Sequence, residues 1–142
     1  MQITYALTDL PEVAASILER YGPDALYALE GDLGAGKTTL VAELCRRLGV
    51  AEPVSSPTFG IVNEYEGARG TIYHLDCYRL QDTAEAVDAG LEELLENAPG
   101  AVFVEWPAVI EPLLPEGVVF LRFTHDASDG GLRHLHITTG RP

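Results

Sequence analysis

The chain has 142 residues, of which 46% are hydrophobic, and it carries a formal net charge of −13. A chain of this length can bury roughly two-thirds of its unfolded surface, so it needs no disulfide or structural metal to fold. A surface this acidic repels phosphate backbones, which argues against autonomous nucleic-acid binding. We therefore expect one domain over residues 1–142, with any nucleic acid held by other proteins.

The distribution of apolar residues and cysteines predicts a cytoplasmic protein. No run approaches the roughly 18 apolar residues of a membrane-spanning helix, and the first residues lack the basic start and cleavage site of a signal peptide. Cys45 and Cys77 form no C-x-x-C pair, and each lies in an apolar segment. We expect both to be small buried hydrophobic side chains in a reducing compartment.

The first third of the chain alternates between strand and helix patterns. The predicted elements are an edge strand over residues 3–7, a helix over 8–22, a short apolar strand over 25–31 and a second helix over 37–48. Pro11 suits the first turn of the first helix, while Gly22 and Gly49 follow the two helices as end signals. A strand, a glycine-rich turn and a helix therefore follow one another directly.

The remaining two-thirds predict an exposed loop over residues 51–60, followed by a hairpin of 59–67 with 70–78. A helical segment over 82–100, interrupted near Gly90, comes next, and a buried strand over 101–105 follows it. A closing hairpin of 117–124 with 132–139 ends the predicted elements. The strand over 101–105 is continuously apolar before its final carboxylate, which is typical of an interior strand. Together these elements predict an α/β fold with a mixed central sheet, antiparallel hairpins and helices on the faces of the sheet.

A phosphate-binding loop lies between the second predicted strand and the second helix. Gly31, Gly36, Lys37 and Thr38 satisfy the pattern G-x-x-x-x-G-K-[ST]. The glycines let backbone N–H groups turn inward as an anion nest, and the following helix adds the positive end of its dipole. Lys37, which is the only lysine of the chain, would reach the β and γ phosphates, and the Thr38 hydroxyl would bind magnesium.

Two carboxylates at predicted strand ends compete for a role beside this loop. Glu105 ends the apolar strand over 101–105, where an acid that supports magnesium is expected. Asp76 ends the preceding strand and lies on the same face as His74, because side chains alternate with a period of two. The pattern alone does not decide which of the two acids serves the metal.

The identity of the nucleotide follows from what the chain lacks. Guanine-specific GTPases usually read the base with an N-K-x-D motif, and the only lysine is already used in the phosphate loop. ATP is therefore the expected nucleotide. Trp106, directly after Glu105, would lie against the base or ribose, with core or interface packing as the alternative.

Four motifs stand in one order between Gly31 and Pro107: GDLGAGKTTL, SSPTF, HLDCYRL and VEWP. Together they resemble the TsaE (YjeE) family of small bacterial P-loop ATPases, over essentially the full length of the chain. The resemblance implies a P-loop NTPase-like domain that binds ATP and Mg²⁺ and hydrolyses ATP weakly by itself. It also implies partners of the TsaB and TsaD type in tRNA threonylcarbamoyladenosine formation, with tRNA contacted only indirectly and no membrane.

The resemblance also implies roles for individual residues. Thr38 and Glu105 would bind magnesium, and Lys37, Thr58 and Asp76 would be the catalytic residues, with Thr58 sensing the γ-phosphate and Asp76 orienting water. Arg133 would approach the nucleotide. The residues implied to bind the phosphates of ATP are Asp32, Leu33, Gly34, Ala35, Gly36, Lys37, Thr38 and Thr39.

Two other functions use the same loop. A small-molecule kinase would need an acceptor pocket, a lid and usually arginines over the phosphates, and 142 residues leave little sequence for a lid. A nucleotide-binding regulator with negligible turnover is the other alternative. We expect the partner-coupled ATPase, with the kinase as the main alternative.

Overall fold

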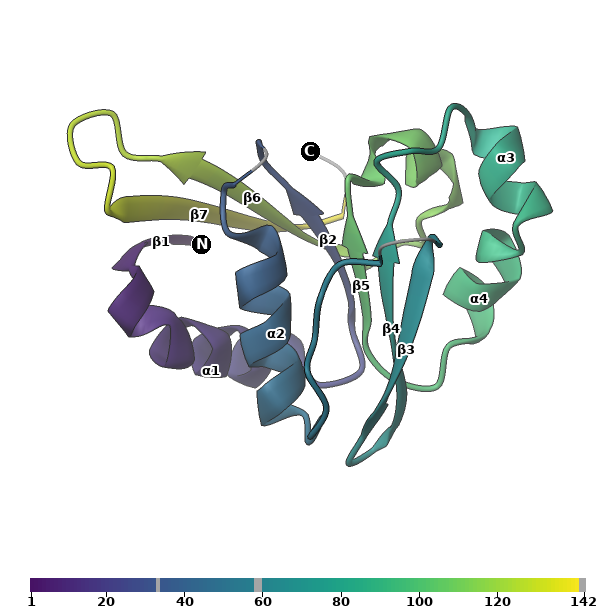
Figure 1. Ribbon diagram of the computed structural model, residues 1–142, viewed down its shortest axis with the longest axis horizontal. Helices are drawn as coiled ribbons and strands as arrows, with labels where there is room; N and C mark the ends of the chain where they lie inside the picture. The colour runs from purple at the N-terminus through teal and green to yellow at the C-terminus, as the bar shows by residue number, and fades with distance from the viewer. Residues whose placement is uncertain (33, 58–59, 141–142) are drawn as a thin grey trace.

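The fold is built on one seven-stranded sheet, seen in a computed structural model that describes residues 1–32, 34–57 and 60–140 (Figure 1). The strands are β1 (Gln2–Ala6), β2 (Leu26–Glu30), β3 (Val62–Gly67), β4 (Gly70–Asp76), β5 (Val102–Glu105), β6 (Val119–His125) and β7 (Leu132–Thr139). Their order across the sheet is β1-β7-β6-β2-β5-β4-β3. The inner strands β6, β2, β5 and β4 pair in parallel, and the outer pairs at both sides are antiparallel. The predicted mixed α/β class is therefore confirmed.

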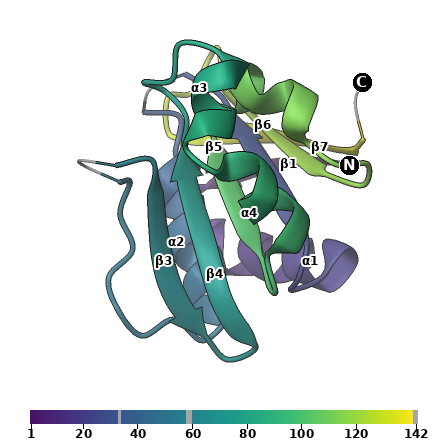
Figure 2. The same cartoon turned by 90° about the vertical axis from the view of Figure 1, so that its right-hand side faces the viewer.

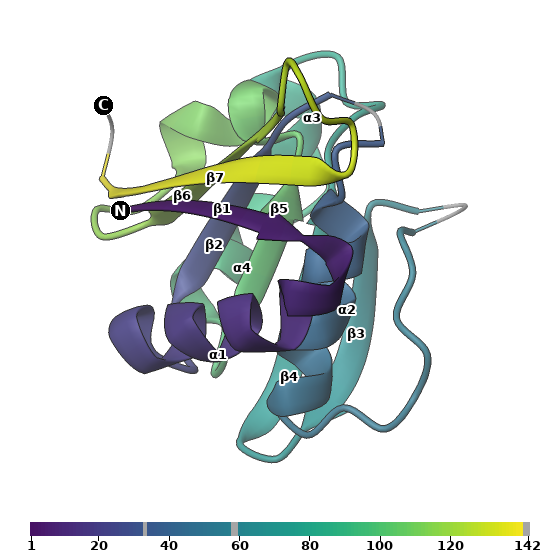
Figure 3. The same cartoon turned by 90° about the vertical axis from the view of Figure 1, so that its left-hand side faces the viewer.

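Helices cover both faces of the sheet. They are α1 (Leu10–Tyr21), α2 (Lys37–Arg47), α3 (Thr83–Asp88) and α4 (Leu91–Asn97), with 3₁₀ segments η1 (Leu7–Asp9) and η2 (Pro107–Leu113). The first two helices lie on one face, and α3, α4 and η2 lie on the other (Figures 2 and 3). In the described part of the chain, no helix is long and apolar enough to cross a membrane.

The two 3₁₀ segments are the elements that periodicity did not predict. In η2, Pro107 occupies the first turn and Pro112 lies inside the segment. Each proline removes a backbone N–H donor, so an α-helical hydrogen-bond ladder cannot run through this stretch, and a short 3₁₀ segment forms instead.

Two apolar cores lie on the two faces of the sheet. Leu40, Val41 and Leu44 of α2 recur at helical spacing and are fully buried against the first face. Cys45 belongs to this core and Cys77 to the core on the other face. Both thiols are free and buried, as predicted, and burial raises the pKa of each to about 12.

Strand register brings the ends of three parallel strands to one edge of the sheet. Asp76 of β4 lies opposite Glu105 of β5, and Glu105 lies opposite Leu29 of β2. The phosphate loop leaves β2 directly after this point. Since parallel strands all end at the same edge, both predicted carboxylates and the loop meet in one crevice, where ligands bind in open α/β sheets.

Candidate functional site

The loop between β2 and α2 has the backbone shape of an anion cradle. Gly36, which precedes the first residue of α2, adopts a φ of 99°, a conformation that side-chain-bearing residues rarely take. A Cβ on Gly31 would lie only 3.0 Å from the Cβ of Phe123, so a side chain there would force the loop and β6 apart by a small shift. The loop therefore delivers the N-terminus of an 11-residue helix to the pocket, with its N–H groups available to phosphate oxygens.

Lys37 is buried at the first position of α2, with an exposed fraction of 5%. Its Nζ donates a hydrogen bond to the carbonyl oxygen of Gly31 and lies 3.4 Å from the centroid of the Trp106 ring. Burial lowers the pKa of the ammonium, and the carboxylate of Glu105 is the largest influence that opposes this shift. A compact cation is thus held at the loop by backbone and aromatic contacts.

Thr38 connects the loop to the end of β5. Its hydroxyl lies 3.0 and 2.9 Å from the two carboxylate oxygens of Glu105 and 2.8 Å from Oγ of Ser56. Hydroxyl and carboxylate oxygens are the ligands that Mg²⁺ prefers, and nucleotide sites use one or two of them together with phosphate oxygens and waters. Among the described residues, no three His, Cys, Asp or Glu side chains could hold a metal by themselves. The Thr38–Glu105 pair fits a magnesium ion shared with a nucleotide.

Asp76 lies beside this pair and lines the same pocket. The pocket has a volume of about 250 Å³ and includes Lys37, Thr38, Ser56, Asp76 and Glu105 in its wall. Oδ1 of Asp76 accepts a hydrogen bond from the backbone N–H of Tyr78, which fixes the carboxylate at the end of β4. The hydrogen bonds of Thr38 go to Glu105, so of the two competing acids Glu105 is the better placed for the metal.

Trp106 forms a wall between this pocket and a larger cavity. It is the one residue other than glycine with positive φ among the described residues, at 57°. Its ring lies against Lys37 on one side, and the Tyr78 ring packs on it with a centroid distance of 4.9 Å. A backbone conformation of this kind costs on the order of 1–3 kcal/mol and persists only where the surroundings enforce it. The contacts with Lys37 and Tyr78 place the indole beside the phosphate loop.

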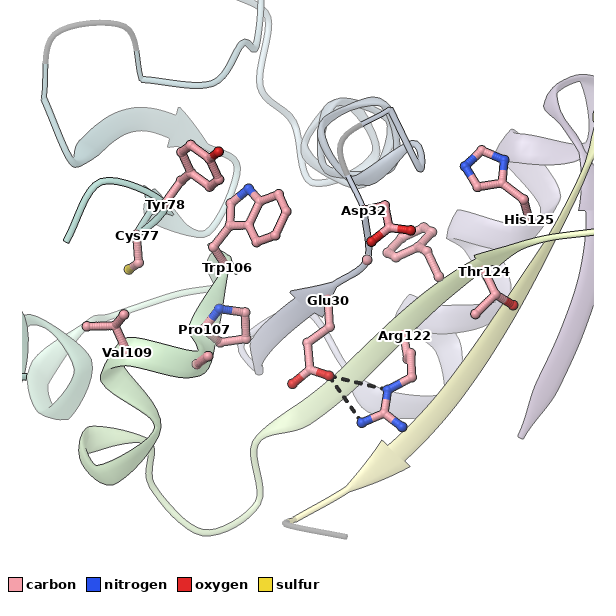
Figure 4. A pocket seen from close by; sticks show the side chains of 13 residues that line it. Glu30, Asp32, Cys77, Tyr78, Trp106, Pro107, Val109, Arg122, Thr124 and His125 are labelled. Atoms are coloured by element: carbon pink, nitrogen blue, oxygen red, sulfur yellow. Dashed lines mark hydrogen bonds and ion pairs between the residues drawn. The ribbon is translucent and has the colours of Figure 1, made fainter. Parts of the chain in front are cut away.

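The larger cavity, of about 770 Å³, opens on the other side of Trp106 (Figure 4). Its wall is mostly apolar, with Pro107 and Val109 on one side and β6 on the other. Across its floor Arg122 donates to Glu30 over 3.2 Å. Glu30, Gly31 and Asp32 line this cavity, so it adjoins the start of the phosphate loop.

His74 is the site residue that the motif analysis missed. It is fully buried in β4, and its Nε2 lies 2.6 Å from Oε2 of Glu105. Lys37, His74 and Glu105 are the three buried polar or charged side chains among the described residues, and all belong to this site. The strand alternation that placed His74 on the face of Asp76 was the available signal, but a histidine within an apolar strand is usually a core residue.

Of the predicted residues that the structure describes, Asp32, Ala35 and Arg133 do not line the Lys37 pocket. Arg133 is the second residue of β7 and donates to the carbonyl oxygen of Gly130 over 2.7 Å. Leu33 and Thr58 lie outside the described residues. Ser56, from the same loop as Thr58, is instead the hydroxyl that the structure brings to Thr38.

Comparison with known families and proteins shows which family this chain resembles. The family model described as "Threonylcarbamoyl adenosine biosynthesis protein TsaE" matches residues 5–134. The chain is 44% identical to the protein named "tRNA threonylcarbamoyladenosine biosynthesis protein TsaE" from Nostoc sp., over 80% of this chain and 70% of that protein. It is 44% identical to the Bacillus subtilis protein of the same name over 66% of this chain and 58% of that protein. The Rickettsia conorii protein of this name is 32% identical over 90% of this chain and 71% of its own.

A solved structure supports the fold. The crystal structure of YdiB from Bacillus subtilis superposes with a TM-score of 0.72 and 27% sequence identity. The superposition covers 99% of this chain and 87% of that one. The arrangement of sheet and helices described above is therefore shared with an experimentally determined protein.

Proposed function

The chain belongs to the TsaE family of tRNA threonylcarbamoyladenosine biosynthesis proteins, and we propose that it is an ATP-binding protein with weak, Mg²⁺-dependent ATPase activity. The observation that carries this proposal is the convergence of Lys37, Thr38 and Glu105 at the phosphate loop. We take residues 1–142 as one nucleotide-binding unit that works in the cytoplasm.

Each residue of the pocket has a distinct part in this proposal. The backbone N–H groups of residues 32–39 bind phosphate oxygens, and the Lys37 ammonium neutralises charge on the β and γ phosphates. Magnesium, held by Thr38 and Glu105, supplies further stabilisation of the phosphate charge. Asp76 orients water toward the γ-phosphate, because it lines the same pocket and its carboxylate is fixed by Tyr78.

Thr58, Trp106 and Arg133 complete the proposed site. Thr58 senses the γ-phosphate from the loop that follows α2. Trp106 borders the bound nucleotide, supported by its contact with Lys37. Arg133 approaches the nucleotide from the N-terminal end of β7.

The proposed partners are proteins of the TsaB and TsaD type. The net charge of −13 supports this arrangement, because tRNA would be held by the partners and not by an acidic surface. In our proposal the chain supplies an ATP-driven conformational step to the partner complex and does not transfer the threonylcarbamoyl group.

Hydrolysis measured with and without partners tests the function. The purified protein should turn over ATP slowly and only with Mg²⁺, and addition of purified TsaB and TsaD should change the rate. A pull-down from extract with a non-hydrolysable ATP analogue should recover both proteins with wild-type chain and not with Lys37→Ala. Fast hydrolysis without partners, or recovery that ignores Lys37, would contradict the proposal.

The 770 Å³ cavity keeps a small-molecule kinase as a second candidate, because it gives an acceptor room beside the phosphate loop. Incubation with γ-labelled ATP and a metabolite pool tests this function. Transfer of label to a metabolite, lost in Lys37→Ala, would establish the kinase. Release of label as inorganic phosphate alone supports the ATPase.

A further inference from the structure

Glu105 is a buried carboxylate that depends on neighbouring donors. Its exposed fraction is 3%, and it lies at the end of an interior strand. A buried carboxylate is stable only when hydrogen bonds replace those of water. Thr38 contributes one hydroxyl proton, which the two carboxylate oxygens and Ser56 can all compete for. A second, dedicated donor is needed to fix the carboxylate in one orientation.

His74 is that donor. Its Nε2 lies 2.6 Å from Oε2 of Glu105, and a carboxylate oxygen can only accept. Nδ1 is buried and has no hydrogen-bond partner among the described residues, so a proton there would be an unsatisfied donor. The ring therefore carries its proton on Nε2, and this N–H donates a hydrogen bond to the carboxylate of Glu105.

The rest of the ring is fixed by packing. His74 is fully buried in β4, one of the two strands that flank β5. The Tyr65 ring of β3 packs against it at 6.4 Å between centroids. The Tyr65 hydroxyl donates to the carbonyl oxygen of Ser55, in the loop whose next residue, Ser56, contacts Thr38. The imidazole is thus fully buried between the Tyr65 ring and Glu105, which leaves it no solvent as an alternative partner.

We propose that His74 is a positioning residue that holds Glu105 in the orientation in which Thr38 and a magnesium-bearing nucleotide meet it. This inference rests on the proposed function, since it gives Glu105 its part at the metal. Groups that orient metal-binding carboxylates act through such hydrogen bonds, and their removal weakens metal affinity by about 10- to 100-fold. His74 itself touches neither metal nor nucleotide in this arrangement.

A pair of substitutions separates positioning from packing. His74→Leu removes the donor, while His74→Gln places an amide N–H close to the position of Nε2. We expect the Mg²⁺ concentration for half-maximal nucleotide binding to rise about tenfold or more in His74→Leu. His74→Gln should return it to within about threefold of wild type, and nucleotide affinity without Mg²⁺ should stay unchanged in both.

His134→Leu is the matched control, because His134 also contacts a carboxylate but lies in β7 and does not line the Lys37 pocket. Its Mg²⁺ dependence should equal that of wild type. Equal Mg²⁺ dependence of folded His74→Leu and wild type would overturn the proposal. So would a loss in His74→Leu that His74→Gln does not reduce, since packing alone would then explain it.

A spectroscopic test needs no nucleotide and therefore distinguishes this inference from the proposed function. In ¹⁵N-labelled protein, the His74 ring should show the Nε2–H form with a strongly hydrogen-bonded proton. This proton should move upfield in Glu105→Gln and stay in place in Asp126→Asn. A His74 ring protonated on Nδ1, or a proton unmoved by Glu105→Gln, would overturn the inference even if ATP binding by the chain were established.

Discussion

The pocket around Lys37 and the hairpin of β6 and β7 near its turn contain the same kinds of residues in different environments. Each has a cation that sequence reasoning assigned to the nucleotide, Lys37 in one and Arg133 in the other. Each also has a histidine bonded to a carboxylate, over 2.6 Å for His74–Glu105 and 2.8 Å for His134–Asp126. The first pair has side-chain exposures of 0% and 4%, and the second has 42% and 20%.

The difference shows that burial and convergence, and not residue type, make this site. In the turn, most hydrogen bonds are local, such as those from Ser128 to Asp126 and from Arg133 to Gly130. Solvent screens such contacts, and exposed ion pairs contribute little. In the pocket, partners come from distant segments, and charges in a desolvated setting act strongly on a ligand. The hydrogen bonds of the turn stay within the turn, whereas those of the pocket join buried groups from distant segments.

The largest expected effect separates the two cations. Lys37→Ala should weaken ATP binding by about 2 kcal/mol or more, roughly 30-fold, because a buried charge-assisted contact is lost. Arg133→Ala should weaken it by no more than about threefold, since the half-buried Arg133 is hydrogen-bonded to its own turn and does not line the Lys37 pocket. Calorimetric titration of both variants with ATP measures the difference. Equal losses of ATP affinity would show that Arg133 contributes as much to ATP binding as Lys37. Lys37→Arg should not restore binding, because the planar guanidinium does not replace a compact ammonium.

The carboxylates give the next effect. Asp76→Asn should lower the ATP hydrolysis rate by about 100-fold, the usual contribution of a group that handles the proton of a reacting water. Its ATP affinity should remain within about threefold of wild type, since the phosphate-binding groups are intact. Asp126→Asn in the exposed turn should leave both quantities unchanged. If Asp76→Asn loses as much affinity as Lys37→Ala, the residue binds ATP or supports folding instead.

A smaller effect concerns magnesium. Glu105→Gln keeps the shape of the side chain but removes its charge, so the Mg²⁺ concentration for half-maximal nucleotide binding should rise about tenfold. Titration of Mg²⁺ at fixed nucleotide concentration checks this. Asp76→Asn is the matched comparison within the same pocket. A larger shift in Asp76→Asn than in Glu105→Gln would exchange the roles of the two acids.

The smallest effect is the pH dependence of stability from the exposed turn. Hydrogen bonds from the side chain and backbone of Ser128, and then from His134, hold the pKa of Asp126 below its ordinary value. A depressed pKa means that the stabilisation is present above about pH 4, the value in the unfolded chain, and is lost as pH falls. The melting temperature of Asp126→Asn should therefore lie slightly below wild type at pH 7, and the gap should shrink toward pH 3. A gap that widens in acid would contradict the assignment.

Local patterns were enough to predict the elements and the phosphate loop. Leucine and valine spacing over residues 37–48 predicted α2, and the structure confirms it as Lys37–Arg47. The Gly31-to-Thr38 motif encodes its own backbone shape, because its glycines and the following helix are contiguous in sequence. The strand end at Glu105 was likewise visible, since a continuous apolar run ends there on a carboxylate, and Asp76 follows the extended segment TIYHL.

Strand order and register decide which carboxylates lie beside the phosphate loop. Thr38 and Glu105 are 67 residues apart and touch only because β5 lies between β2 and β4. Glu105 reaches His74 because β4 is the other neighbour of β5. The residue after β5, Trp106, lies with its ring against Lys37. The sequence by itself determined the phosphate loop and the fold class, because short-range periodicity and turn chemistry encode both. The buried contacts of Glu105 belong to the tertiary structure, because no local pattern specifies which strands become neighbours.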